Sequence, residues 1–261
     1  MKPFVDTDSV MRVIWGKSDT TLFIFAGASA EFALNKAVDW LYYTGRLPAD
    51  PLGRLFSTVL YARDIVFADE ENALKAIDRI TAIHRGVEGN RGYAIPAWAY
   101  RDVLFMLIHY SIASFELLER PLLEPEKQEV FQVFFRVGQR MGIPDLPPTY
   151  AAWTRARMEH ISRDLARSHY TVDLFRQYRR HLGRLRYVLL REVQRRLVPD
   201  PVRRMLDMQP FSWLPPVLFA YKASRSIHLD RFLKSLLVPR TYLGQVRELD
   251  IQPVAVSALH A

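Results

Sequence analysis

One histidine stands where a protein could put an imidazole to chemical use. In the segment TAIHRGVEG, His84 follows Ile77 and Ile80 and precedes Val87 at helical spacing. Residues three and four apart share one face of a helix, so His84 should point toward the core. An inward imidazole needs a partner for at least one ring nitrogen, which could be a carbonyl, a carboxylate or a metal ion. The pattern alone leaves these options open and favours a structural partner.

A second pair of residues could bind an anion. Arg54 and Thr58 lie four apart, so they share a face of the helix that Asp50 and Pro51 begin. A guanidinium in the first turn can hold a carboxylate or a propionate. On its own the spacing is equally compatible with a surface salt bridge.

Three further histidines differ in their surroundings. His109 lies in the apolar stretch LFMLIHYSIASF and should be buried and hydrogen-bonded. It could line a cavity opposite His84 or bond a neighbouring helix. His160 and His169 lie among charged residues, so we expect both to be exposed and give them no role.

Helical patterns that could position these side chains cover nearly the whole chain. No run alternates with period two, so we predict an all-α fold and one multi-helix globular domain over 1–261. The apolar helix over 97–119 should lie at its centre. Gly89 and Asn90 should end the helix that carries His84. The expected helices span about 20–43, 51–67, 70–87, 97–119, 124–141, 150–167 and 171–197 (the last two capped by Thr149 and Thr171), with short helices around DPVRRML and HLDRFLKSLL.

Composition and missing motifs exclude several classes of functional site. The 261 residues are 49% hydrophobic and 25% charged, which is typical of a soluble globular protein. The absence of cysteine excludes disulfides, thiolate metal sites and thiol nucleophiles. Phosphate-loop, HExxH zinc, nucleophile-elbow and dinucleotide motifs are missing. The N-terminus has no secretory signal pattern, so we expect a cytoplasmic protein.

The net charge of +8 comes mostly from arginines between Arg155 and Arg204. Such a surface could meet nucleic acid, anionic lipid or an acidic partner. No helix-turn-helix or base-stacking pattern accompanies it, so we expect no specific nucleic acid. The segment PFSWLPPVLFAY is apolar but short and rich in proline. It could lie against a membrane surface or line a pocket.

The order of several motifs resembles the mpaB/rubber-oxygenase catalytic domain family, which includes the latex clearing proteins. ADPLGRLFST is similar to the family's D-P-x-x-R-x-x-x-T, and AIHRGVEG to I-H-x-x-V-x-G. FAGASAEFALNKAVDW precedes them. GYAIPAWAYRDVLFMLIHYSIASF and RVGQRMGIPDLPPTYAAW follow in the family's order. The resemblance is strongest over residues 22–167 and leaves the basic helices of 168–261 outside it.

The resemblance implies an all-α oxygenase that binds haem b. His84 matches the axial iron ligand, and Arg54 and Thr58 match residues near the haem. Asp39 and His109 are further candidates for the distal side or for supporting contacts. The implied activity is oxidative attack on a hydrophobic small molecule with dioxygen.

Two other hypotheses stay open. The chain could keep the fold without the cofactor and bind a hydrophobic ligand. It could instead be a basic helical adaptor that meets nucleic acid or an anionic membrane through 155–204. The sequence does not set the oligomeric state.

Overall fold

The structure is a computed structural model that describes residues 2–43, 45 and 49–225, with the side chains of 41, 51, 52, 54–57, 59, 60 and 223–225 left out. Within these residues there is no β-strand, and the prediction of an all-α fold is confirmed. The helices are α1 (Val10–Gly16), α2 (Ser18–Phe32), α3 (Asp39–Tyr43), α5 (Pro51–Phe67), α6 (Glu70–Arg91), α7 (Ala97–Leu118), α8 (Glu124–Arg140), α9 (Tyr150–Arg163), α10 (His169–Leu197), α11 (Asp200–Met205) and α12 (Leu214–Arg225).

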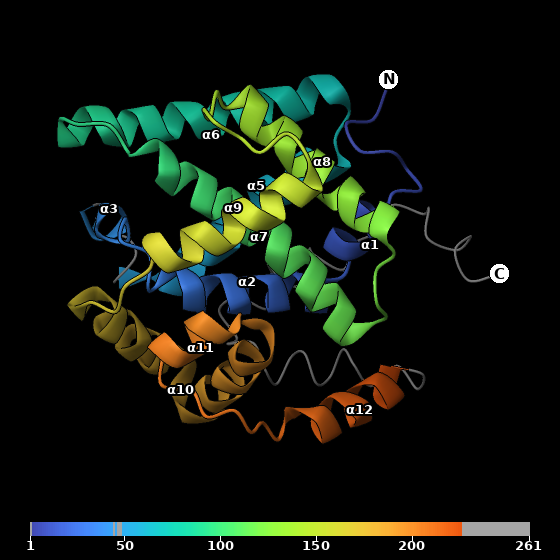
Figure 1. The fold of residues 1–261 in the computed structure, drawn as a ribbon, viewed down its shortest axis with the longest axis vertical. Coiled ribbons are helices and arrows are strands. Elements are labelled where there is room, and N and C mark those ends of the chain that lie inside the picture. Colours follow the sequence, from blue (N-terminus) through green and yellow to red (C-terminus); the bar gives the residue numbers. More distant parts are fainter. Residues whose placement is uncertain (1, 44, 46–48, 226–261) are drawn as a thin grey trace.

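Helix α7 runs through the middle of the molecule, as the sequence predicts (Figure 1). It packs most extensively on α2 and also contacts α1, α8, α9 and α10. The close approach of α2 depends on Gly27, because a Cβ there would lie 2.2 Å from the Tyr110 ring. One cluster of buried apolar side chains extends from Phe4 to Leu218, so the described helices other than α3 share a core.

The helix expected over 20–43 is two helices, and the prediction is wrong at the break. Asn35 interrupts it between α2 and α3. Its side-chain oxygen accepts from the Ala37 backbone N–H at 2.8 Å, and its amide nitrogen donates to Asp102 at 2.6 Å. Asparagine that bonds the nearby backbone competes with helix formation, and here a distant carboxylate holds it in that conformation.

The helix that carries His84 does not end at Gly89. Helix α6 continues to Arg91, and Gly92 caps it in the left-handed conformation at φ 83°. Left-handed backbone favours glycine, so the stop signal is Gly92 rather than Gly89. His84 therefore lies two turns inside the helix and not at its end.

Other boundaries differ by smaller amounts. Helix α9 ends at Arg163, and Ser168 rather than Thr171 caps α10. Pro215 and Pro216 do not break PFSWLPPVLFAY, because they lie in the first turn of α12, where backbone N–H groups have no partner within the helix. The helix predicted around HLDRFLKSLL lies outside the described residues.

None of the described helices combines the length and the apolar character that a membrane span requires.

Candidate functional site

His84 lies on the side of α6 that faces α7. Its neighbours along that side follow the predicted stripe, with Ile77 fully buried and Ile80, His84 and Val87 half-buried. The imidazole packs edge-on against the Tyr100 ring of α7, with 5.2 Å between the ring centroids. The Nδ1 atom of His84 is shielded from solvent.

Glu88 fixes the tyrosine that packs against His84. The Tyr100 hydroxyl donates to Glu88 Oε1 at 3.1 Å, and the Ile95 backbone N–H donates to the same oxygen at 2.8 Å. Burial and then the Glu88 charge raise the pKa of Tyr100, so its hydroxyl stays protonated as the donor. The contacts of one carboxylate therefore set the position of the ring beside His84.

Asp39 joins α3 to the same side of α6. Arg91, seven residues after His84, donates to Asp39 Oδ2 at 2.6 Å. The guanidinium also lies over the rings of Trp40, Tyr43 and Tyr93, at 4.1, 5.2 and 4.7 Å from their centroids. These contacts give Asp39 a definite role as the anchor of Arg91.

Thr58 lies half-buried on α5, the helix that packs along α6. The helix begins as predicted, with Asp50 accepting from the Gly53 N–H at 2.9 Å and Pro51 in the first turn. The side chain of Arg54, four residues before Thr58, lies outside the described residues.

His109 lies away from His84. Nine residues separate it from Tyr100 on α7, which places the two on opposite sides of the helix and about 13 Å apart along its axis. A ring nitrogen of His109 donates to the Leu197 carbonyl of α10, which matches the alternative in which it bonds a neighbouring helix. Burial and then the charge of Arg157 lower the pKa of His109 to about 4.

Near His109, a buried ion pair joins three helices. Arg157 of α9 donates to both carboxylate oxygens of Glu31 on α2, at 2.6 and 2.5 Å. The Tyr110 hydroxyl of α7 donates to Glu31 at 2.8 Å. Burial opposes ionisation of Glu31, but the charge and hydrogen bonds of Arg157 hold its pKa below the usual value.

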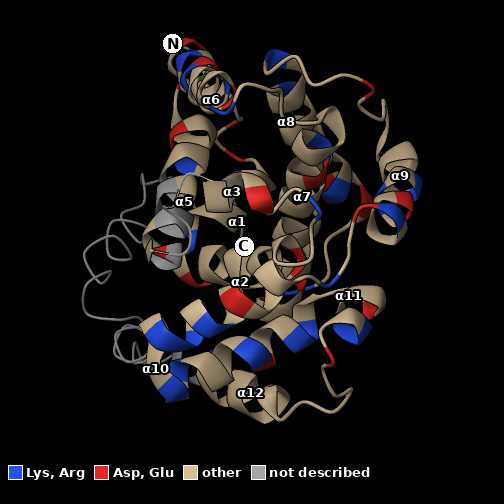
Figure 2. Ribbon diagram, turned by 90° about the vertical axis from the view of Figure 1, so that its left-hand side faces the viewer, with Lys and Arg blue, Asp and Glu red and all other residues tan. Residues whose placement is uncertain are grey.

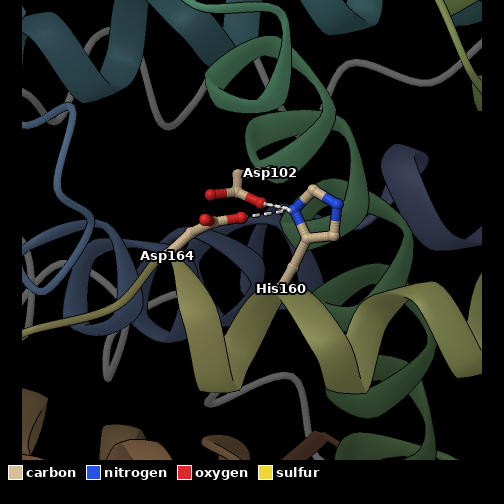
Figure 3. A group of neighbouring side chains, drawn as sticks. All are labelled: Asp102, His160 and Asp164. Atoms are coloured by element: carbon tan, nitrogen blue, oxygen red, sulfur yellow. Dashed lines mark hydrogen bonds and ion pairs between the residues drawn. The ribbon is translucent and has the colours of Figure 1, made fainter.

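A second buried polar cluster lies about one helical turn further along α9 (Figure 3). The Nδ1 atom of His160 meets Asp102 of α7 and, at 3.1 Å, Asp164 just beyond α9. The three donor atoms lie close enough together to hold a metal ion. Asn35 donates to the other oxygen of Asp102, and Arg163 donates to both oxygens of Asp164 at 2.8 Å. Each carboxylate thus has its own supporting donor, an arrangement also found around metal ligands.

The expectation that His160 is exposed is wrong, because only 6% of its surface is accessible. His169 is exposed as predicted. A signal in the sequence could have found His160. It lies seven residues after Trp153 and next to Ile161, so it shares the buried face of α9 with both. Of the charged residues around it, Arg155, Glu159 and Arg163 are exposed, whereas Arg157 and Asp164 are buried with it.

The structure therefore brings the candidates together in two places. His84 and Asp39 lie along one side of α6, with Thr58 on the adjacent helix. His109 belongs to the polar interior between α2, α7 and α9. A surface hollow of about 350 Å³ beside α3 is lined in part by Asn35 and Asp39 but not by His84.

Residues 15–226 match the family model described as ER-bound oxygenase mpaB/B'/Rubber oxygenase, catalytic domain. The chain belongs to this family. The match extends through α10 and into α12, beyond the region of strongest motif resemblance. The mpaB/rubber-oxygenase domain therefore includes the basic helices. No curated protein matches the chain.

Membership in the mpaB/rubber-oxygenase family makes the chain an oxygenase catalytic domain. An oxygenase domain implies dioxygen and a small-molecule substrate. Among the described residues, a cofactor could be held by the imidazole beside an apolar helix face at His84 or by the Asp102, His160 and Asp164 donors.

Proposed function

We propose that the protein is a haem-dependent oxygenase that acts on a hydrophobic small molecule, with His84 as the axial iron ligand. The observation that carries the proposal is the placement of His84. In a chain of this family, a half-buried imidazole is held between α6 and α7 by an aromatic ring. Haem, when bound, supplies iron that binds and activates dioxygen.

The residues around His84 fit this group in type. Ile80 and Val87 continue the apolar side of α6, and Ile95 and Trp98 pack in the small apolar cluster with Trp40. An apolar lining suits a porphyrin and a hydrophobic substrate, and it excludes water from the reacting centre. The imidazole nitrogen is the donor that haem proteins use most often.

Each supporting residue has a distinct task in this proposal. Tyr100, fixed by Glu88, sets the plane of the His84 ring. Arg54 and Thr58 order the pocket or pair with a propionate from the adjacent α5. Asp39 positions α3 through Arg91. His109, which is neutral at physiological pH, supports the interior behind α7 and does not touch the ligand.

An absorption spectrum of the purified protein, expressed with an adequate haem supply, tests the proposal. We expect a Soret band in the wild type, its loss in His84→Ala, and its retention in His169→Ala, which removes an exposed histidine. Variants that still fold by circular dichroism give the decisive comparison. A wild type that retains no Soret band after reconstitution with haemin and removal of the unbound haemin would contradict the proposal.

Metal analysis of the same sample distinguishes haem at His84 from a metal ion bound elsewhere in the protein. The buried donors of Asp102, His160 and Asp164 favour a metal ion held without haem as the alternative. Stoichiometric metal without a Soret band, lost in His160→Ala and kept in His84→Ala, would assign the cofactor to that cluster and overturn the assignment to His84.

A further inference from the structure

The end of the molecule formed by α10 and α12 combines unpaired arginines with exposed apolar side chains. It lies opposite α6 in both views, although α10 also packs on α5 (Figures 1 and 2). We propose that this basic-aromatic face, defined by Arg179, Arg180, Arg184, Phe211, Trp213 and Phe219, binds the surface of an anionic lipid membrane. The proposal is independent of the cofactor.

The arginines lie on both sides of a kink in α10 at Gly183, where φ is 73°, and no acidic residue separates them in the sequence. Residues 174–191 contain six arginines and no aspartate or glutamate. Arg179, Arg180 and Arg184 are exposed, and no described acidic side chain pairs with them. Figure 2 shows the basic positions along the side of α10 that faces the viewer. By contrast, Arg91, Arg140 and Arg163 each pair with a carboxylate.

The apolar component comes from α12 and the loop before it. Leu214 and Leu218 are buried against the core, and the Tyr221 hydroxyl donates to Asp19 at 3.0 Å. The helix is thus attached by one narrow face. Phe211 and Phe219 remain 78% and 77% exposed.

Two hydrogen bonds hold the aromatic loop beside the basic helix. Arg195 donates to the Phe211 carbonyl at 2.7 Å, and Ser212 donates to Glu192 at 2.8 Å. Helices α10 and α12 also pack on each other. The apolar groups therefore lie beside the part of α10 that follows the kink at Gly183, the part that also carries Arg184. Exposed aromatic side chains next to arginines are the combination that binds the interface of an anionic bilayer.

The composition of this face favours lipid over two other partners. Leu185, Val188 and Val217 are exposed among the arginines and aromatics. Aliphatic side chains cannot stack on nucleic acid bases, whereas the acyl boundary of a bilayer accommodates them. A second copy packed on the same face would bring like-charged arginines together, which opposes association.

Sedimentation of the full chain with vesicles tests the proposal. We expect binding to vesicles of phosphatidylcholine with phosphatidylserine, weakened by salt, and much less binding to phosphatidylcholine alone. The triple variant Arg179→Gln/Arg180→Gln/Arg184→Gln should lower the partition coefficient roughly a hundredfold, or about fivefold per arginine. Phe211→Ser/Phe219→Ser should lower it without removing the salt dependence.

A matched control comes from α9, which carries an exposed arginine and an exposed methionine. Arg155→Gln/Met158→Gln should leave vesicle binding unchanged. Equal losses in this control and in the two test variants would overturn the proposal, as would no binding to anionic vesicles at low salt. A dimer that the phenylalanine variant converts to a monomer would assign the face to a second copy. If the protein bound nucleic acid through these arginines and did not bind vesicles, the membrane proposal would likewise be rejected.

Discussion

His109 illustrates, at the scale of single residues, how burial sets a protonation state. Its pKa falls to about 4, first through burial and then through Arg157. The unfolded chain has a histidine pKa of about 6.5, so between about pH 6.5 and 4 it binds a proton that the folded chain excludes. The associated stability is fully present above about pH 6.5 and is lost as the pH falls through that window.

Replacing the His109 imidazole should remove its contribution to the pH dependence of stability. We expect His109→Gln to unfold with a shallower dependence on pH between about 6.5 and 4.5, by up to about 1.4 kcal/mol per pH unit. The measurement is urea unfolding of both proteins across this range. Glu31 contributes separately, since its lowered pKa places its loss of stability below about pH 4.5. Identical pH profiles would show that His109 is accessible to protons in the folded state.

The sequence predicts the direction of a side chain where that direction depends only on spacing within one helix. The direction of His84 follows from its spacing to Ile77 and Ile80. The partners of His109 and His160 come from other helices, at Leu197 and Asp102, and the spacing on one helix cannot reveal them.

At the scale of elements, two glycines three residues apart in α6 and its cap have opposite roles. Gly89 lies within the helix, and a Cβ added there meets nothing within 4 Å. Gly92 adopts φ 83°, which L-residues rarely tolerate. We therefore expect Gly89→Ala to raise the free energy of unfolding by up to about 1 kcal/mol, because alanine favours helix. Gly92→Ala should lower it by about 1 to 2 kcal/mol.

Urea unfolding of the two alanine variants at neutral pH tests this assignment. The pair is well matched, since both glycines are exposed and close in sequence. If Gly89 ended the helix, as its sequence alone suggests, the Gly89→Ala variant would be the less stable of the two. That order would contradict the continuation of α6 to Arg91.

Helix positions were more predictable than helix ends. The starts of α5 and α9 follow from Asp50 and Thr149, whose side chains accept from their own helices. The break at Asn35 instead depends on Asp102, which is far away in the sequence. Ends that depend on such tertiary contacts leave no clear local signal.

At the scale of the whole molecule, buried polar contacts determine which helices pack against each other. Apolar faces alone do not specify a particular partner helix. Glu31, Tyr110 and Arg157 come from α2, α7 and α9. Asp102 and His160 connect α7 and α9 again. The all-α class and the central position of α7 are predictable from hydrophobic patterns, since they require only apolar faces. Buried ion pairs between helices cannot be predicted from these patterns, because any acidic residue on one helix could face any basic residue on another.

The Glu31–Arg157 pair should therefore behave as a unit in stability. Glu31→Gln leaves the Arg157 charge buried without a counterion, so we expect a loss of about 3 to 5 kcal/mol in the free energy of unfolding. Arg157→Met leaves the Glu31 charge buried without a counterion, so we expect a similar loss in the free energy of unfolding. The double variant Glu31→Gln/Arg157→Met removes both charges and should lose clearly less than the sum of the two single losses. Urea unfolding of the four proteins at neutral pH gives the coupling energy directly. Strictly additive losses would mean that the two side chains do not interact in the folded protein.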